Sequence, residues 1–425
     1  MTSFPAPAHP ESVFTYAAPQ LKFGPGASAE IGYELSRMNV GRAALVTDAR
    51  LAATGLPQRI ADQIRGFAID CVVFDRVHIE PTDESITAAV AWARSHGAFD
   101  ALVAVGGGST IDTAKAMNLL TTNDGELADY LNPPIGAGRA PARALHPLIA
   151  VPTTTGTGAE STTVCVLDVL SLQVKTGISH PALRPDLAVV DPELTLTQPA
   201  GVTAAAGMDI LCHALESYTA RPYSGFDAKA PEQRVPYCGA NPISDMWSER
   251  ALELLGRSFR RAVADGADRE ARYDMAVAAT FAGLGFGNAG VHIPHANAYP
   301  IAGRVRSFRP AGYPDAEALV PHGMAVGLTA PSAFRFTFET SPQRHLRAAH
   351  MLAPGATGTD AEVLPGVIAD LMHDIGIPDG LGAVGYSESD ISDLVAGSIK
   401  QQRLLALSPR PVTEDDLAEI FRRSL

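Results

Sequence analysis

One aspartate and several histidines in the second half of the chain have the types and spacing that suit a metal ion. In the stretch GMDILCHALE, Asp209 and His213 are four positions apart, so a helix would project both side chains from one face. His292 and His295 follow in VHIPH, and His322 follows in PHG. A carboxylate and three imidazoles can hold Fe²⁺ or Zn²⁺, and with room for a substrate oxygen the ion would act as a Lewis acid. We predict a catalytic metal centre here; for any single histidine, packing in the core is the alternative.

A glycine-rich turn in the first half has the composition of a phosphate-binding loop. Residues 100–115 (DALVAVGGGSTIDTAK) lead from an apolar strand through Gly106–Gly108 into a helix, with Ser109 and Asp112 at a capping-box spacing. Glycines let the backbone approach a ligand closely, and the free N–H groups at a helix start attract phosphate. The pattern is not GxGxxG, because Ile111 stands where the last glycine would be. An ordinary turn that feeds a helix is therefore an equal alternative.

Three further features extend the predicted nucleotide site. The stretch Thr153–Glu160 (TTTGTGAE) follows the next apolar strand and suits a second wall of the same cleft. Asp48 ends the strand ALVTD, where a carboxylate can bind an adenosine ribose and disfavour a 2′-phosphate, which favours NAD over NADP. A helix cap is the alternative for Asp48. Only five lysines occur in the chain, and two of them, Lys115 and Lys175, fall on or near this cleft.

The elements that must position these residues divide the chain in two. Five apolar runs alternate with helical patterns in the first half, which predicts βαβ units and a parallel sheet: residues 42–48, 71–74, 100–105, 147–152 and 187–191. From about residue 195 onward the strand signal ends and helical patterns follow one another, at residues 204–220, 244–264, 270–283, 325–336, 343–353, 360–375 and 387–405. We predict an α/β dinucleotide-binding domain with a Rossmann-like sheet at 1–195 and an all-helical metal-binding domain at 196–425.

Composition excludes several classes of protein. The 425 residues carry 33 Lys and Arg against 46 Asp and Glu, a net charge of −13, which argues against nucleic acid or an anionic membrane surface as partner. No run of about 18 apolar residues occurs, so we expect no membrane-spanning helix. The four cysteines are far apart, and the first residues lack a basic or an apolar targeting segment. These features favour a cytoplasmic enzyme.

In combination, the motifs resemble those of the iron-containing (type III) alcohol dehydrogenase family. GGGSxxDxAK, TTxGTGxE and GxDxxxHxxE occur in family order, and the similarity runs over nearly the whole chain. The resemblance implies a dehydroquinate synthase-like fold, NAD, Fe²⁺ or Zn²⁺, and often a homodimer or larger homo-oligomer. The metal ligands that it implies are Asp209, His213, His295 and His322. The predicted cofactor-binding residues are Asp48, Gly107, Gly108, Ser109, Asp112, Thr153, Thr154, Thr157 and Lys175.

The same alignment shows one departure from the family. His295 is preferred to His292 as metal ligand because the segment FGNAGVHIPHANAYPIAG then aligns without gaps. Four residues after this ligand, where much of the family has a histidine beside the nicotinamide, the chain has Tyr299. We predict that Tyr299 or His292 replaces that histidine in proton transfer.

Further stretches, among them GANPISDMW and LSPRPVTEDDL, are similar to the transhydrogenase branch of the family. The similarity implies hydride transfer from a hydroxy acid to an oxo acid through bound nicotinamide: 4-hydroxybutyrate would become succinic semialdehyde while 2-oxoglutarate becomes D-2-hydroxyglutarate. Both substrates are small carboxylates, so we expect a substrate contact from at least one arginine of two long loops, with a solvated surface role as the alternative. These arginines are Arg221, Arg234, Arg304, Arg306 and Arg309.

Three other functions stay open at this point. The nearest is an NAD-dependent iron-type alcohol dehydrogenase, or an aldehyde or maleylacetate reductase, that releases its cofactor in each cycle. A second is a zinc enzyme related to glycerol dehydrogenase or dehydroquinate synthase, which the GxDxxxHxxE helix and His322 in PHG disfavour. A third is a nucleotide-binding protein without catalysis, which the complete set of metal-ligand residues disfavours.

Overall fold

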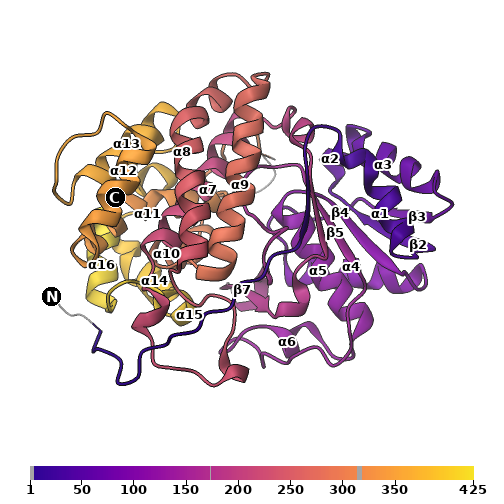
Figure 1. The fold of residues 1–425 in the computed structure, drawn as a ribbon, viewed down its shortest axis with the longest axis horizontal. Helices are drawn as coiled ribbons and strands as arrows, with labels where there is room; N and C mark the ends of the chain where they lie inside the picture. Colours follow the sequence, from indigo (N-terminus) through magenta and orange to yellow (C-terminus); the bar gives the residue numbers. More distant parts are fainter. Residues whose placement is uncertain (1–3, 173, 314–317) are drawn as a thin grey trace. The chain divides into compact units, whose positions relative to one another are not determined.

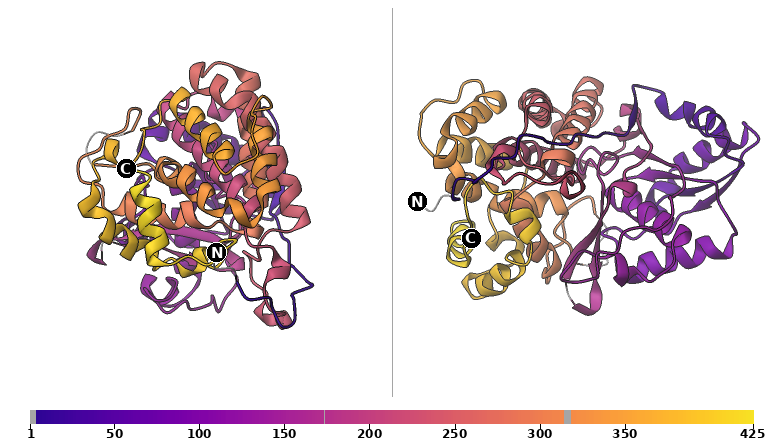
Figure 2. Two further views of the ribbon diagram at one scale, coloured as in Figure 1. Left: turned by 90° about the vertical axis from the view of Figure 1, so that its left-hand side faces the viewer. Right: turned by 60° about the horizontal axis from the view of Figure 1, so that its bottom comes forward.

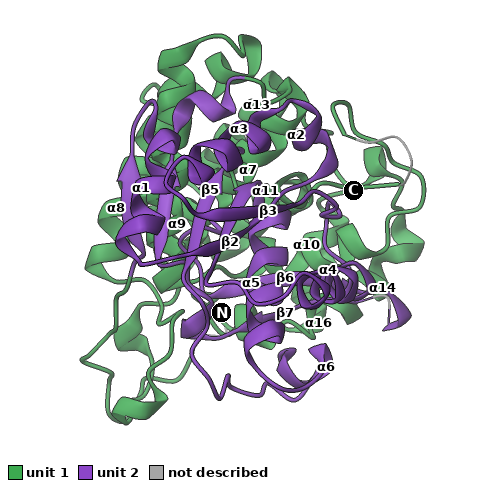
Figure 3. Cartoon of the chain, turned by 90° about the vertical axis from the view of Figure 1, so that its right-hand side faces the viewer, with its two compact units in different colours: residues 1–17, 155–157, 197–425 green, residues 18–154, 158–196 purple. Residues whose placement is uncertain are grey.

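A computed structural model describes residues 4–172, 174–313 and 318–425. The chain forms two compact units, drawn in different colours in Figure 3. The α/β unit comprises Ala18–Thr154 and Gly158–Leu196, and the helical unit comprises Met1–Ala17, Thr155–Thr157 and Thr197–Leu425. Each unit is described by itself.

The α/β unit is built on a six-stranded parallel sheet (Figure 1). Its strands lie in the order β1-β8-β5-β4-β2-β3, and every neighbouring pair is parallel. The strands are β1 (Gln20–Phe23), β2 (Arg42–Val46), β3 (Asp70–Phe74), β4 (Ala101–Gly106), β5 (Leu148–Pro152) and β8 (Leu187–Val190). Five of them are the five strands expected from the apolar runs, so the predicted parallel sheet is confirmed.

Alternate residues of these strands fill two separate cores, one on each face of the sheet. Leu45 and Val103 pack with α1 and α3, whereas Ala44 and Ala104 pack with α4 and α5. The strands are therefore apolar on both faces, as a parallel sheet covered by helices requires. The helices of this unit are α1 (Ile31–Arg37), α2 (Ala49–Ala53), α3 (Leu56–Arg65), α4 (Asp83–Ser95), α5 (Gly108–Thr122) and α6 (Leu127–Tyr130).

Strand order changes direction between β2 and β4. The chain runs from β2 outward to the edge strand β3 and then returns to the other side of β2 as β4. In open parallel sheets, ligands bind beyond the carboxyl ends of the strands at such a switch point. Asp48 follows β2 and Gly107 follows β4, so two predicted nucleotide-binding residues lie at this position.

An antiparallel hairpin next to the sheet was not expected from the sequence. It pairs β6 (Val164–Val169) with β7 (Val174–Ser179). Asp168 lies opposite Lys175 in this pairing. Charged residues inside two short strands hide the alternation that predicts a hairpin.

The helical unit has no strand among its described residues, as predicted for the second half of the chain (Figures 1 and 2). The helices are α7 (Ala200–Thr219), α8 (Pro242–Ala264), α9 (Arg269–Ala289), α10 (Ile293–Gly303), α11 (His322–Thr337), α12 (Pro342–Leu352), α13 (Val363–Asp374), α14 (Ile391–Ser398), α15 (Gln402–Leu405) and α16 (Glu414–Arg422). Two of them, α10 and α16, were not among the expected helices.

The observed division differs from the predicted boundary at residue 195 in two places. The first residues of the chain belong to the helical unit because they are bonded to a later loop: Glu11 accepts hydrogen bonds from Lys229 N–H (2.9 Å) and Arg234 Nη2 (3.1 Å). Thr155–Thr157 also belongs to this unit; Thr155 N–H donates to Gln198 Oε1 (3.3 Å).

The connection between α9 and α10 is a sharp bend. The two helix axes differ by 103°, and Gly290 at the bend has φ +91°, a conformation that side-chain-bearing residues rarely adopt. The start of α10 is thereby directed toward α7. Across the described residues, no single helix is long and apolar enough to cross a membrane. The bent α9–α10 pair, taken together, has the length and apolar composition of a membrane span, and these are the only two properties on which it qualifies.

Candidate metal and nucleotide sites

Three predicted histidine ligands lie around a carboxylate oxygen of the fourth predicted ligand, Asp209, in the helical unit. Asp209 Oδ1 lies 3.6 Å from His213 Nε2, 3.4 Å from His295 Nε2 and 3.8 Å from His322 Nε2. Ligand atoms in a tetrahedral site with bonds of about 2.1 Å are separated by roughly 3.4 Å. The spacing therefore suits one divalent cation among Asp209, His295 and His322, whose ligand atoms all lie within 4.8 Å of one another. His213 approaches Asp209 but is not part of this three-residue group, so its role as a fourth ligand stays a prediction.

The buried polar atoms at this cluster indicate that a cation belongs there. Among the described residues, Asp209 Oδ1 and His295 Nε2 are buried without a hydrogen-bond partner. Buried polar atoms are nearly always satisfied, and a cation would satisfy both of these. The side chain of His322 is 23% exposed, whereas that of Asp209 is 2% exposed, so the cluster is open on the His322 side. A catalytic metal site needs such an open position for a substrate oxygen.

Close packing of α7 holds the first two ligands. Gly207 lets the ring of Phe259 in α8 lie directly against the α7 backbone, at a distance that no Cβ could tolerate. The imidazole of His213 is stacked on Phe286 of α9, with ring centroids 3.7 Å apart and planes at 5°. The ring plane of His213 is therefore fixed by packing rather than by a hydrogen bond at Nδ1.

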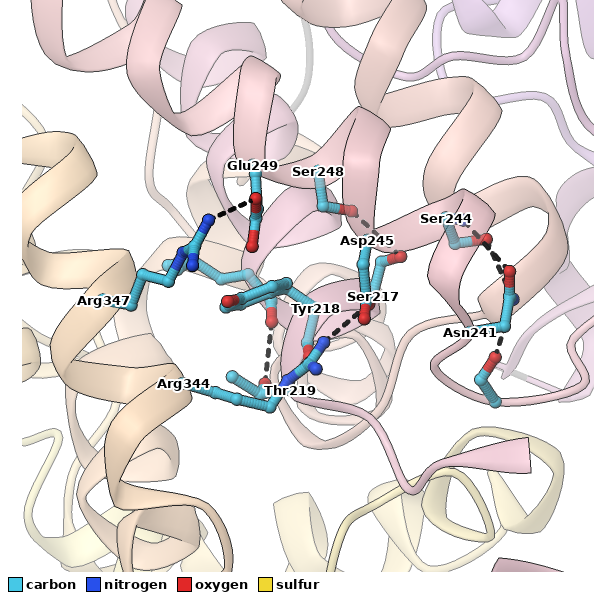
Figure 4. A network of polar contacts seen from close by, with 12 residues as sticks. Ser217, Tyr218, Thr219, Asn241, Ser244, Asp245, Ser248, Glu249, Arg344 and Arg347 are labelled. Atoms are coloured by element: carbon cyan, nitrogen blue, oxygen red, sulfur yellow. Dashed lines mark hydrogen bonds and ion pairs between the residues drawn. The ribbon is translucent and has the colours of Figure 1, made fainter. Parts of the chain in front are cut away.

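Arg344 of α12 anchors the end of α7, and Arg347 of the same helix binds the neighbouring helix α8 (Figure 4). Arg344 Nε donates to the Tyr218 carbonyl (2.6 Å), Arg344 Nη2 donates to Asp245 Oδ1 (2.6 Å), and the guanidinium lies 4.0 Å from the centroid of the Tyr218 ring. Arg347 pairs with Glu249 of α8 (2.7 Å). A cation at the last carbonyls of a helix is favourably placed, so this network stabilises the end of the helix that carries the ligands.

Glu216, one turn beyond His213, orients His295. His295 Nδ1 donates to Glu216 Oε1 (2.6 Å), and the backbone N–H of His292 donates to Glu216 Oε2 (2.6 Å). With its proton on Nδ1, His295 directs the Nε2 lone pair at the cluster, the usual carboxylate–histidine–metal arrangement. In the sequence, Glu216 is visible only as the last position of GxDxxxHxxE, because its contact with His295 spans 79 residues.

The electrostatics of the cluster favour a cation. Burial acts against charge on each group, yet the surrounding imidazoles lower the pKa of Asp209 below its ordinary value. For His295, burial lowers the pKa, but Glu216 and Asp209 outweigh burial and raise it to about 9 while no cation is bound, so a metal ion at Nε2 would displace a proton from that atom. Burial lowers the pKa of His213 to about 3, so His213 is a neutral imidazole at physiological pH, as a metal ligand must be.

Gly323 lets the fourth ligand approach Asp209. A Cβ at this position would overlap the Ala205 carbonyl oxygen and lie 2.8 Å from Asp209 Cβ. We expect Gly323→Ala to push the start of α11 away from α7, to displace His322 and to weaken metal affinity at least about tenfold, a cost of about 1.4 kcal/mol. Metal titration with a competing chelator measures the effect. Gly303→Ala is the matched control, because nothing lies within 4 Å of its Cβ position; equal affinities in the two variants would contradict the prediction.

The two predicted proton-transfer residues occupy different surroundings. His292 is fully buried at the start of α10 and pairs its Nε2 with Thr219 Oγ1 (3.1 Å), so the structure does not bring it into the ligand cluster. The ring of Tyr299 lies edge-on to His322, with centroids 6.5 Å apart. Of the two, Tyr299 is the residue beside the open side of the cluster, and its role in proton transfer stays a prediction.

In the α/β unit, the two predicted nucleotide walls adjoin. Pro152 of β5 is the register partner of Gly106 of β4, and Thr153 N–H donates to the Gly106 carbonyl (3.0 Å). A Cβ on Gly107 would lie only 3.0 Å from Thr154 Oγ1. Because residue 107 is a glycine, the two walls can approach each other closely. This agrees with the expectation that they lie side by side, since each follows the end of a neighbouring strand.

The expected capping box at the start of α5 does not form. The helix begins at Gly108, and its cap residue Gly107 offers no side chain. Ser109 Oγ instead accepts from Glu80 N–H (3.0 Å), and Asp112 Oδ2 accepts from Val166 N–H (2.9 Å). Asp112 thus faces the β6 hairpin and is not brought to the loop. Among the described residues no side chain caps α5, which leaves its first N–H groups for a phosphate.

The remaining predicted cofactor residues have other partners. Asp48 caps α2 through Oδ1, which accepts from the N–H groups of Arg50 and Leu51 (both 2.9 Å). Lys175 is buried between Glu80 (2.7 Å) and Asp168 (2.9 Å). Burial lowers the pKa of Lys175, but these two carboxylates outweigh burial and raise it. Thr157 falls in the segment assigned to the helical unit. Their contacts with a cofactor stay predictions.

Glu160, in the second wall, predicts a dependence of stability on pH. Burial raises its pKa from 4.5 to about 7. Because the folded protein holds this proton more tightly than the unfolded chain, stability from this group is present below pH 4.5 and is lost as pH rises to 7. We expect Glu160→Gln to exceed the wild type by on the order of 3 kcal/mol in unfolding free energy at pH 8 and by much less at pH 5. Urea unfolding at both values measures this; Glu84→Gln, an exposed control, should show no such trend.

The five arginines, at least one of which is expected to contact a substrate carboxylate, have partners within the helical unit. Arg234 pairs with Glu11 (3.1 Å), Arg304 with Asp393 (2.8 Å) and Arg306 with Asp390 (2.8 Å). The Arg221 guanidinium is stacked between Phe4 and Phe226 and donates to the Gly225 carbonyl, while Arg309 Nη1 donates to the Ser307 carbonyl (3.0 Å). These contacts favour a structural role for Arg221, Arg234, Arg304 and Arg306, whereas the carbonyl to which Arg309 donates is two residues away in the chain. A contact between any of the five and a substrate carboxylate stays a prediction.

A parallel α/β unit with a phosphate loop, and a helical unit with an Asp–His metal cluster, define an oxidoreductase class that combines a dinucleotide with a metal ion. Residues 18–192 match the family described as iron-containing alcohol dehydrogenase, and residues 203–425 match the C-terminal part of the Fe-containing alcohol dehydrogenase family. The chain belongs to the iron-containing alcohol dehydrogenase family, and Asp209, His295 and His322 form its metal site.

Individual relatives agree with this assignment. The chain is 44% identical to the mitochondrial hydroxyacid-oxoacid transhydrogenase of Bos taurus over 97% of this chain and 90% of that protein. Among solved structures it resembles a 1,3-propanediol oxidoreductase (30% identity, TM-score 0.85, 97% and 100% coverage). It also resembles the sulfoacetaldehyde reductase of Bifidobacterium kashiwanohense in complex with NAD⁺ (30% identity, TM-score 0.80, 97% and 98% coverage).

The relatives also correct the predicted location. Transhydrogenases that are 42–44% identical to this chain, from cattle, rat, human and Dictyostelium discoideum, are mitochondrial by name, so the prediction of a cytoplasmic enzyme is wrong. Its basis was weak in physical terms. Well-separated free cysteines indicate a reducing compartment but do not identify which one.

Proposed function

We propose that this chain is a hydroxyacid-oxoacid transhydrogenase that converts 4-hydroxybutyrate and 2-oxoglutarate to succinic semialdehyde and D-2-hydroxyglutarate. The supporting observation is its 44% identity over 97% of the chain to a protein of that name, against 30% for the solved oxidoreductase and reductase. The exchange balances: the hydroxy acid loses two electrons and two protons, and the oxo acid gains both, so no external oxidant is consumed.

Two resident groups fit the residues present. The unsatisfied Asp209 Oδ1 and His295 Nε2 suit Fe²⁺ or Zn²⁺, and the uncapped start of α5 beside Gly107 suits the pyrophosphate of NAD. When bound, the cation supplies Lewis-acid polarisation of a substrate oxygen, and the nicotinamide supplies a two-electron carrier. The family name favours iron.

The chain's own residues then have separate tasks. Asp209 supplies negative charge at the cluster, and Glu216 keeps the proton of His295 on Nδ1. Tyr299, beside His322, would exchange the hydroxyl proton of the substrate. Asp48, after β2, would favour NAD over NADP.

The decisive experiment omits nicotinamide. Purified, desalted protein receives Fe²⁺ or, in parallel, Zn²⁺, with 4-hydroxybutyrate and 2-oxoglutarate, and 2-hydroxyglutarate formed per chain is measured. Many turnovers support a transhydrogenase that retains its cofactor. No product without NAD, but steady NADH formation from an alcohol once NAD is added, identifies an NAD-dependent iron-type alcohol dehydrogenase, as the solved relatives favour.

A further inference from the structure

Lys115 is a buried cation that neither the metal centre nor the phosphate loop uses directly. It lies on α5, two turns after Gly108, and its side chain is 0% exposed. Nζ donates to the carbonyl oxygens of Ala159 (2.7 Å), Val164 (2.8 Å) and Thr162 (3.1 Å), and to Thr162 Oγ1 (2.9 Å). One ammonium group thus binds four oxygens of a six-residue segment.

Burying the charge of Lys115 is unfavourable, so its contacts must compensate for the loss of water. These contacts fit a compact cation. Removal of an ammonium group from water is strongly unfavourable unless its partners compensate. Asp112 Oδ1, 3.7 Å from Nζ, balances the charge, and the four oxygens satisfy the three N–H donors. The chain otherwise prefers arginine, which makes up 28 of its 33 basic residues once the five lysines are subtracted. A planar guanidinium does not match oxygens that converge on a single point.

The segment that Lys115 gathers is the continuation of the second nucleotide wall. Thr153 and Thr154 precede it, and Thr154 is the residue that Gly107 closely approaches. The start of α5 therefore contacts the first part of the second wall at Thr154. Lys115, farther along the same helix, binds the residues that follow this wall, from Ala159 to Val164. One helix fixes both ends of the stretch and also offers its N–H groups to the phosphate.

We propose that Lys115 is a cofactor-positioning residue, which holds residues 159–164 against α5 and thereby sets the distance between the second wall and the phosphate-binding start of that helix. This inference rests on the proposed nicotinamide function. Lys115 does not touch the cofactor in this arrangement. It acts by preventing the wall from opening.

The test measures NADH affinity in protein freed of nucleotide. We expect Lys115→Met, which keeps most of the side-chain length but removes the charge, to raise the NADH dissociation constant at least about tenfold in a fluorescence titration. Metal content should stay at the wild-type value, because the ligands lie in the other unit. Lys22→Met is the matched control: Lys22 also forms ion pairs in the α/β unit, on β1 at the sheet edge, and its loss should leave affinity within twofold.

Chemical rescue with an added amine distinguishes a positioning role of Lys115 from a general contribution to the stability of the fold. In Lys115→Ala the missing atoms correspond to n-propylammonium, which should restore NADH affinity several-fold, whereas a guanidinium of similar size should not. Should Lys115→Met fail to fold, Lys115→Ala is purified with n-propylammonium and the amine is then withdrawn. Affinity that falls while the melting temperature holds supports the proposal; loss of both together overturns it.

The outcomes separate this inference from the function on which it rests. If wild-type protein does not bind NADH, the nicotinamide function fails and this inference fails with it. If wild-type protein binds NADH and folded Lys115→Met binds it within twofold, the inference alone is overturned.

Discussion

Asp209→Asn is expected to remove the metal ion and to lower turnover at least about a thousandfold, which corresponds to about 4 kcal/mol of lost transition-state stabilisation. Oδ1 of this residue is the atom that three histidine nitrogens approach within 3.8 Å. An amide keeps the shape but removes the charge that offsets a buried divalent cation. Metal per chain from elemental analysis, together with product formation in the assay without nicotinamide, measures both effects.

Asp268→Asn is the control for this substitution. Asp268 caps α9 in the same unit by accepting from Ala271 N–H (3.0 Å), a role that asparagine fills equally well. We expect wild-type metal content there. A folded Asp209→Asn protein that purified with one metal ion per chain and full turnover would refute the assignment of the metal centre.

Glu216→Gln should weaken metal affinity 10- to 100-fold without removing a ligand. The carboxylate accepts from His295 Nδ1 and from the His292 N–H, both at 2.6 Å. A glutamine can accept at only one of its two terminal atoms, so either the imidazole loses its partner or an NH₂ group faces the His292 N–H. Competition with a chelator gives the affinity, and the visible spectrum of the Co²⁺ form reports the changed geometry.

Glu253→Gln serves as the matched control for Glu216→Gln. Glu253 is an exposed carboxylate of α8 whose partner is Arg250 (2.7 Å). Its replacement should leave both affinity and spectrum unchanged. A Glu216→Gln protein with the wild-type Co²⁺ spectrum would show that His295 is oriented by packing alone.

The sequence predicts the parts of this molecule whose causes are local. Buried parallel strands such as β4 are continuous apolar runs, and the glycines Gly106–Gly108 at the end of β4 mark the predicted phosphate loop without reference to distant residues. Asp209 and His213 are linked by helical spacing alone. These features need no knowledge of packing, and the structure has them where they were expected.

Other features depend on contacts that no local pattern contains. α10 was missed because Pro294 and Pro300 disfavour a helix, although Pro294 occupies the first turn, where its missing N–H costs nothing. The choice of His295 over His292 is explained by Glu216, far away in sequence. Asp112 fits a capping box by spacing, yet the charge of Lys115 and the N–H of Val166 draw it to the β6 hairpin.

The order of the ligands along the chain has a consequence for synthesis on the ribosome. All four ligands belong to the helical unit, and the last of them, His322, emerges more than a hundred residues after Leu196, which completes the α/β unit. Domains generally fold as they are made, from the N-terminus onward. The α/β half can therefore fold while the metal centre is still incomplete, and the full set of ligands exists only once His322 has been made.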